Sequence, residues 1–252
     1  MRAPVDTIAA PLFPTRLPWV NAAGPQATIQ RGRPMLVEFW DFCRPNSLRT
    51  LPYVKAWHER YAAAGLRTVG VHCSSFEPAR SEPAVREAVA RLGIGYPVLI
   101  DSAFEVWELY GNRGWPARYL FDGRARLFDY HHGEGAYAET ELAIQELLGV
   151  QREPLAPLRP EDEPGARLAP QTEDQPGAYS GPYEAGGVWA VLDGSGTARV
   201  SGGPAEGSFE LEVSHPGAYA LFEHERHTAG VLDLQLSPGV ECLATCFTPG
   251  VV

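Results

Sequence analysis

Residues 35–53 read MLVEFWDFCRPNSLRTLPY, and this stretch decides the fold. Its first part, residues 35–42, is an apolar and aromatic run of the kind found in strands buried within a parallel sheet. A helix is predicted next by apolar residues that recur every three or four positions, namely Leu48, Leu51, Val54, Trp57 and Tyr61. The stretch therefore predicts a buried strand that leads directly into a helix.

Further elements alternate along the chain on the carboxyl side of this stretch. The pattern predicts, in order, a strand at 66–72, a helix at 84–92, a strand at 97–100, a short helix at 104–110, strands at 117–121 and 125–130, and a helix at 137–148. The last two strands form a hairpin, because Asp122-Gly123 is a favoured hairpin turn. This order predicts an α/β protein with a central mixed sheet that helices cover on both faces.

The composition changes after this region. Residues 153–182 are rich in proline and acidic residues and lack apolar periodicity, which is typical of a semi-rigid linker. Short apolar segments at 188–192, 208–213, 218–222, 231–236 and 242–247 then alternate with Gly, Pro, Asp and Ser clusters. This pattern predicts a small antiparallel β module. We therefore predict three parts: a mixed-sheet domain at 1–150, a linker at 151–182 and a β module at 183–252.

Charge and hydropathy exclude several classes of protein. The formal net charge is −10, so the chain lacks the basic surface that a nucleic-acid partner requires. No apolar run approaches the roughly 18 residues that span a bilayer. Prolines interrupt residues 1–34, which also lack the apolar block of a signal peptide. We therefore expect a soluble, cytoplasmic protein without a membrane span.

Ordered sequence blocks carry a family resemblance. Phe39-Trp40 precedes LRTLPY at 48–53, NRGWPA follows at 112–117, GEG at 133–135 and PGVE at 238–241. With these blocks the chain resembles thioredoxin-like proteins of the TlpA/ResA type, and over most of its length the soluble thioredoxin-plus-β-module part of DipZ-type proteins. The resemblance implies a thioredoxin-like fold and, as the family's activity, thiol–disulfide exchange.

The family's catalytic motif is replaced in this sequence. Its members carry a C-x-x-C pair where the first strand meets the helix. Twelve residues separate Trp40 from Pro52, as in thioredoxins generally, so the alignment needs no gap. In that register the two cysteine positions fall on Arg44 and Ser47, neither of which is a thiol. The resemblance therefore predicts the scaffold together with a degenerate active site.

The resemblance also implies a substrate groove. Its expected residues are Arg44 and Ser47, together with Trp115 and Pro116, because the corresponding proline of the family is cis and shapes the groove. An alternative is that Pro116 persists only because the fold requires the turn. Trp115 would either pack beneath the groove or bind a partner.

Two of the four cysteines are candidates for chemistry. Cys43 lies at the strand-to-helix junction, where the helix N-terminus and Arg44 favour a thiolate, although Asp41 opposes it. In the implied fold Cys73 ends a neighbouring parallel strand about 4.8 Å away, and a disulfide needs Cα atoms about 4.4–6.8 Å apart. Cys43 and Cys73 could therefore form a redox pair if their side chains leave the same face. Alternatively, Cys43 packs as a small apolar side chain.

The other cysteines predict no site. Cys242 and Cys246 are four residues apart in a predicted strand, so we expect both on one face, buried and too far apart to pair. The set Cys43, His72 and Cys73 offers too few ligands for zinc or copper. We therefore predict neither a metal nor a cofactor.

Two functions remain open at this stage. The first is an atypical thiol–disulfide redox protein in which Cys43 is the nucleophile and Cys73 the resolving thiol. The second is a redox-inactive binding or assembly module that presents Trp115 and the β module to a partner. Either function would involve a protein partner, and the first also admits a small thiol.

Overall fold

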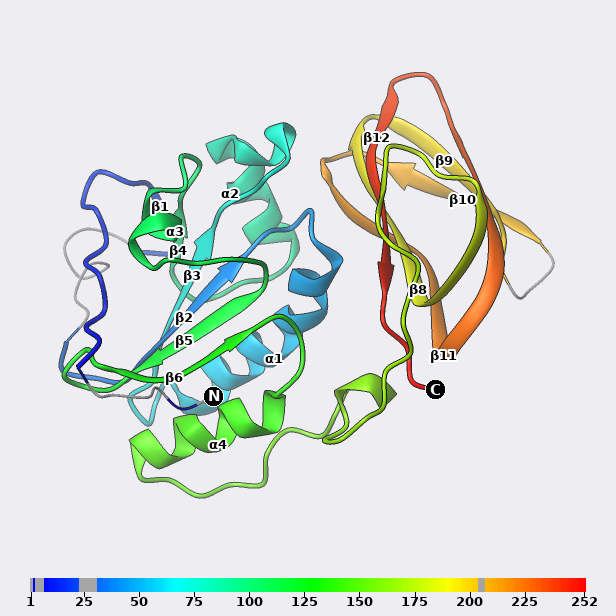
Figure 1. Ribbon diagram of the computed structural model, residues 1–252. Coiled ribbons are helices and arrows are strands. Elements are labelled where there is room, and N and C mark those ends of the chain that lie inside the picture. The colour runs from blue at the N-terminus through cyan, green and yellow to red at the C-terminus, as the bar shows by residue number, and fades with distance from the viewer. Residues whose placement is uncertain (1, 3–6, 23–30, 204–206) are drawn as a thin grey trace. The chain divides into compact units, whose positions relative to one another are not determined.

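The computed structural model describes residues 2, 7–22, 31–203 and 207–252. By their contacts the residues divide into two units, one made of 1–41 and 46–156 and the other of 42–45 and 157–252. Each unit contains a six-stranded sheet (Figure 1). The four residues 42–45 thus group with the second unit, although they lie within the first in sequence.

The first unit is built on a mixed sheet. Its strands, in the order β1-β4-β3-β2-β5-β6 across the sheet, are β1 (Trp19–Val20), β4 (Val98–Ile100), β3 (Arg67–His72), β2 (Met35–Trp40), β5 (Ala117–Phe121) and β6 (Leu127–His132). The central strand β2 pairs in parallel with β3 and antiparallel with β5. This arrangement confirms the predicted mixed sheet.

Helices cover both faces of this sheet. They are α1 (Pro45–Tyr61), the 3-10 helix η2 (Glu77–Arg80), α2 (Glu82–Arg91), α3 (Glu105–Leu109) and α4 (Tyr137–Leu148). On one face, Val106 of α3 packs in an apolar cluster with Val37, Phe39 and Val71. On the other face, α1 and α4 are joined through hydrogen bonds to a buried carboxylate of α4. Every residue of β2 is buried because both faces are covered.

The second unit contains an antiparallel sheet, as predicted. Its strands, in the order β10-β9-β11-β8-β12-β7, are β10 (Ser208–Val213), β9 (Gly196–Gly202), β11 (Gly217–Leu236), β8 (Gly181–Gly194), β12 (Val240–Thr248) and β7 (Gln175–Pro176). A separate apolar cluster, which includes Val188, Leu192 and Phe247, forms its core. The preceding chain carries one further 3-10 helix, η3 (Pro160–Asp162).

The prediction that Cys242 and Cys246 lie on one face of their strand was wrong. A register shift between Cys242 and Ala244 adds a residue to β12 and resets the alternation of side chains. Cys242 and Phe247 therefore both pack in the core cluster, whereas Cys246, the neighbour of Phe247, lies on the opposite face. A bulge of this kind leaves no mark in the spacing of the cysteines.

Within the described residues, no helix combines the length and the apolar character that crossing a membrane requires.

Candidate functional site

The carboxyl ends of β2 and β3 lie side by side. Trp40 and His72, the last residues of these strands, are directly paired in the parallel register. The N–H of Cys73 then donates to the carbonyl of Trp40 at 3.3 Å. The chain leaving β3 therefore places Cys73 beside the end of β2, as the sequence predicted for neighbouring parallel strands.

Cys73 is enclosed in the core of the first unit. Its side chain has no exposed surface and packs in the apolar cluster beneath α3. Burial raises the pKa of the Cys73 thiol well above its ordinary value, and the nearby carboxylates of Asp101 and Asp41 add to the rise. The Trp115 indole donates to the carbonyl of Cys73 at 2.8 Å. This thiol is therefore held in its protonated, poorly nucleophilic form.

Cys43 lies two residues before Pro45, the first residue of α1. Its side chain is fully buried, whereas that of Arg44 is partly exposed. The carbonyl of Phe42 accepts a hydrogen bond from the N–H of Ala218 at 3.0 Å, a contact within the second unit. Cys43 thus lies near the N-terminus of α1, but its sulfur atom is buried.

All four cysteines are free thiols. Cys43 and Cys73 are therefore not joined in this structure, and a redox link between them stays a prediction. Cys242 and Cys246 are buried in the second unit, and burial raises the pKa of each thiol, to about 12 for Cys246. None of the three thiols with a shifted pKa is poised as a thiolate.

The predicted groove residues of the first unit lie in different environments. Ser47 is fully buried, and its hydroxyl oxygen accepts the N–H of Asp41 at 3.2 Å. The Trp115–Pro116 peptide bond is cis, and Pro116 is buried. The Trp115 ring is partly exposed and lies 4.4 Å from the ring of Trp107. Of this set, Trp115 offers the accessible apolar surface.

A buried carboxyl group, Glu38, was missed in the sequence reasoning. It lies in the middle of β2, directly opposite Gly70 on β3 and Arg118 on β5. The Tyr96 hydroxyl donates to its Oε2 at 3.1 Å. Burial raises the pKa of the Glu38 carboxyl to about 8, although the Tyr96 hydrogen bond and the Arg118 charge oppose the rise. The one acid within the otherwise apolar 35–40 run was the signal that could have found it.

Two further groups complete the electrostatics around β2 and β3. Burial lowers the pKa of His72 to about 3, and its ring lies 5.0 Å from that of Trp40. The Arg118 guanidinium lies over the Tyr137 ring, with its carbon 4.9 Å from the ring centroid. At neutral pH, Glu38, His72 and Cys73 are therefore all mainly uncharged. The interior around β2 and β3 therefore carries little charge from these three groups, and the Cys73 thiol within it is a poor nucleophile.

An ion pair ties the start of α1 to the loop before α4. Arg49 of α1 contacts Glu134 with Nε and Oε2 2.9 Å apart, and both side chains are largely buried. A salt bridge with little access to water is costly to break, because either partner alone would leave a buried charge. This contact fixes the helix that follows Cys43 and Arg44.

Within 7–22, 31–203 and 207–252, no three His, Cys, Asp or Glu side chains gather closely enough to hold a metal ion.

Comparison with known proteins places the fold in context. No family model matches the chain. DipZ of Mycobacterium tuberculosis is 33% identical over 163 residues, which cover 61% of this chain and 24% of DipZ. ResA of Halalkalibacterium halodurans, named a thiol-disulfide oxidoreductase, is 26% identical over 117 residues, which cover 46% of this chain and 61% of ResA. The match to DipZ therefore spans about a quarter of that relative's length.

A solved structure supports the same fold. The crystal structure of a thioredoxin-like superfamily protein matches 58% of this chain and all of its own, with a TM-score of 0.52 and 20% sequence identity. At that identity the likeness concerns the fold alone. The chain thus contains a thioredoxin-like fold, and its homologues include DipZ proteins and thiol-disulfide oxidoreductases of the ResA type.

Proposed function

We propose that this chain is a thioredoxin-fold binding module whose cysteines do not exchange disulfides in the folded state. One observation carries the proposal: Cys43 and Cys73, which follow the two central strands, each have no exposed surface. The raised pKa of Cys73 supports the same conclusion, because the thiolate is the reactive form. Both sulfur atoms then act as small apolar groups in the packing.

The proposed contact surface in the first unit is centred on Trp115. This ring is partly exposed, and its indole N–H is held by the carbonyl of Cys73. Phe104 and Trp107 pack against it, with ring centroids at 6.1 and 4.4 Å. An aromatic side chain held in one orientation loses little conformational entropy on binding, which favours a protein partner.

Alkylation of the native protein with iodoacetamide, followed by mass mapping of each cysteine, tests the proposal. Cys242 and Cys246 are internal controls because both are buried in the second unit. We expect all four thiols to react slowly, and about 100-fold faster after denaturation, because reaction requires local opening. A disulfide reductase assay is expected to give only background activity. Rapid labelling of Cys43 alone would contradict the proposal.

A second candidate function is atypical thiol–disulfide exchange through Cys43. It is favoured by the position of Cys43 just before α1, next to Arg44, where a thiolate is stabilised. The Cys43 thiolate would attack a partner disulfide, form a mixed disulfide and release one partner thiolate. The Cys73 thiolate would then attack Cys43 Sγ, form the Cys43–Cys73 disulfide and release the second partner thiolate. The partner disulfide is reduced by two electrons, which the two protein thiols supply.

The two functions are separated by oxidation of the wild type and of Cys43→Ser and Cys73→Ser. A Cys43–Cys73 disulfide that a reductant reverses, together with loss of disulfide reductase activity in both variants, would support thiol–disulfide exchange. Activity at background in all three proteins would support the binding module.

Two predictions from the sequence accompany this proposal. The division into a thioredoxin-like domain at 1–150, a linker at 151–182 and a β module at 183–252 is retained as a proposal. The cytoplasmic location stays a prediction.

A further inference from the structure

Arginines gather at one end of the first unit's sheet, opposite the end at which Cys73 follows β3. Hydrogen bonds join the chain segments there: the N–H of Arg67 donates to the carbonyl of Pro34, and that of Gly32 to the carbonyl of Gly123, both at 2.9 Å. The amino ends of β2 and β3 therefore lie beside the β5–β6 turn. Together these segments carry five arginines, namely Arg31, Arg33, Arg67, Arg124 and Arg126.

The charge of this arginine cluster is largely unbalanced. Four of the five side chains are exposed, and Arg67 is partly exposed. Among the residues that the structure describes, none of the five forms an ion pair. Asp122, the acid of these segments, accepts the backbone N–H groups of Arg124 and Arg126 at 2.8 Å. Burial and the charge of Arg33 both lower the pKa of Arg67, in keeping with repulsion inside the cluster.

A cavity of about 380 Å³ adjoins these charges. Ala9, Ala10 and Leu12 line its apolar part, and Arg31, Arg124 and Arg126 line its charged part. The wall is held by backbone hydrogen bonds: Ala10 N–H donates to Ala125 O at 2.9 Å and Leu127 N–H to Ile8 O at 2.8 Å. Its volume lies within the range of small-molecule sites, about 300–1,000 Å³.

On the two sides of the cavity, Arg126 is anchored by a hydrogen bond and Leu12 is mostly exposed. The guanidinium of Arg126 donates from Nη1 to the carbonyl of Thr7 at 2.7 Å. This hydrogen bond fixes the Nη1 side of the group, and its other N–H groups remain as donors for a ligand. Leu12 is 76% exposed among the described residues, so an apolar ligand group that covers it would remove apolar surface from water. A ligand with both an anionic and an apolar part would satisfy both sides of the cavity.

We propose that this cavity binds a small organic anion whose carboxylate or phosphate group lies among Arg31, Arg124 and Arg126 and whose apolar part covers Ala9, Ala10 and Leu12. Guanidinium groups recognise both anionic groups through paired hydrogen bonds. In a chain of net charge −10, a local excess of arginine concentrates anions at one place rather than over the whole surface.

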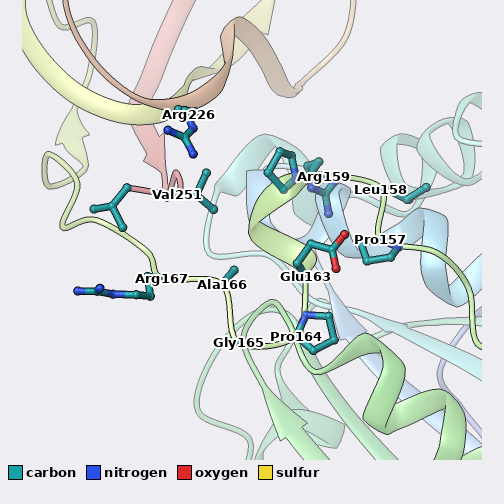
Figure 2. A pocket seen from close by; sticks show the side chains of 12 residues that line it. Pro157, Leu158, Arg159, Glu163, Pro164, Gly165, Ala166, Arg167, Arg226 and Val251 are labelled. Atoms are coloured by element: carbon teal, nitrogen blue, oxygen red, sulfur yellow. The ribbon is translucent and has the colours of Figure 1, made fainter.

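A larger depression in the second unit fits such a ligand less well. It has a volume of about 830 Å³ and is lined by residues 157–160 and 163–167, Arg226 and residues 251–252 (Figure 2). Its Arg159 is already neutralised, since Nη2 lies 2.9 Å from Asp162 Oδ2 and Nε 3.9 Å from Glu161 Oε1. Arg226 on this depression therefore provides a matched control for Arg124.

Calorimetric titration with octanoate tests the proposal, with 1-octanol and inorganic phosphate as probes of each half of the ligand. We expect saturable octanoate binding with a dissociation constant below about 1 mM. We expect both other probes to bind at least about ten-fold more weakly, because each lacks one half of the contacts. Arg124→Gln should weaken octanoate binding about ten-fold or more, whereas Arg226→Gln removes the same charge elsewhere and should leave it unchanged.

Both variants change an exposed side chain, so their thermal midpoints should equal that of the wild type. Equal affinity for octanoate and phosphate would overturn the proposal that the ligand needs an apolar part. Equal affinity for octanoate and octanol would overturn the proposal that it needs an anionic group. Absence of octanoate binding, or equal weakening by Arg226→Gln, would overturn the site itself. None of these results bears on the reactivity of the thiols.

Discussion

At the scale of single residues, Glu38 is an acid held in a fully buried environment. Its neighbour across the β2–β3 pair is Gly70, where an added Cβ would lie 3.0 Å from Trp40 Nε1 and 3.2 Å from Tyr96 Cε2. Such contacts are tighter than most that a Cβ makes, so a larger residue here would have to displace the Trp40 or Tyr96 ring by a few tenths of an ångström. Glycine at one position thus permits the hydrogen bond that keeps a buried acid partnered.

The raised pKa of Glu38 predicts that the folded state loses stability with rising pH. Between its ordinary value of 4.5 and about 8, the folded state holds the proton and the unfolded state has released it. The free energy of unfolding should therefore fall as pH rises through this window, by at most about 1.4 kcal/mol per unit. Glu38→Gln should remove that slope while keeping an acceptor for Tyr96. Urea denaturation at about pH 6.5 and about pH 8 measures it.

His72 also contributes in this interval, with the opposite sign. Its pKa is about 3 in the folded state and 6.5 ordinarily, so the unfolded state loses part of a proton between about pH 6.5 and about pH 8, equally in the wild type and in Glu38→Gln. The difference in slope between the two proteins therefore reports Glu38. Glu87→Gln, an exposed change on α2, is the control and should retain the wild-type slope. An unchanged slope in Glu38→Gln would show that the carboxyl group is ionised throughout.

At the scale of elements, a single carboxylate joins α1, α4 and the chain that follows them. Glu141 of α4 accepts from Trp57 Nε1 at 3.1 Å and from the Tyr61 hydroxyl at 2.6 Å, both on α1. It also accepts the N–H of Leu155 at 2.8 Å and lies 3.1 Å from Arg60 Nη1. Its side chain is 1% exposed, so its charge depends on these partners.

Replacing Glu141 should therefore be costly. Glu141→Gln keeps the shape but removes the charge and exchanges one acceptor for a donor that faces other donors. We expect the free energy of unfolding to fall by about 1–3 kcal/mol. Glu139→Gln on the same helix changes an exposed side chain and should cost less than about 0.5 kcal/mol. Equal effects of the two substitutions in urea denaturation would contradict this role of Glu141.

The elements of the first unit were readable from the sequence because their signals are local. The apolar run at β2, the three-to-four spacing in α1 and the Asp122-Gly123 turn each depend on neighbouring residues. In the second unit, β11 was predicted as two strands, because polar residues at 223–228 interrupt its apolar pattern at a register shift. β9 was missed because only a few of its residues are apolar.

The candidate site was less predictable than the elements. The sequence placed Cys73 beside the end of β2 correctly, since parallel pairing follows from the fold. Its burial under α3 depends on aromatic packing that involves residues about thirty to forty positions away, such as Trp107 and Trp115. Accessibility of a thiol is thus a tertiary property that spacing along the chain does not encode.

At the scale of the whole molecule, each unit has its own apolar core, which predicts two unfolding transitions. Leu99 belongs to the core cluster of the first unit and Leu192 to that of the second, and both are fully buried. Removing either side chain creates a cavity in one core only.

Leu99→Ala and Leu192→Ala should therefore each lower a different transition in calorimetry. Each substitution is expected to cost about 2–5 kcal/mol, because a buried leucine is replaced by a methyl group in a close-packed interior. The two are matched in chemistry and in burial, so each serves as the other's control. A common transition that both substitutions lower equally would contradict this prediction, because it would mean that the two cores unfold together. Separate shifts would instead show that each core unfolds according to its own contacts.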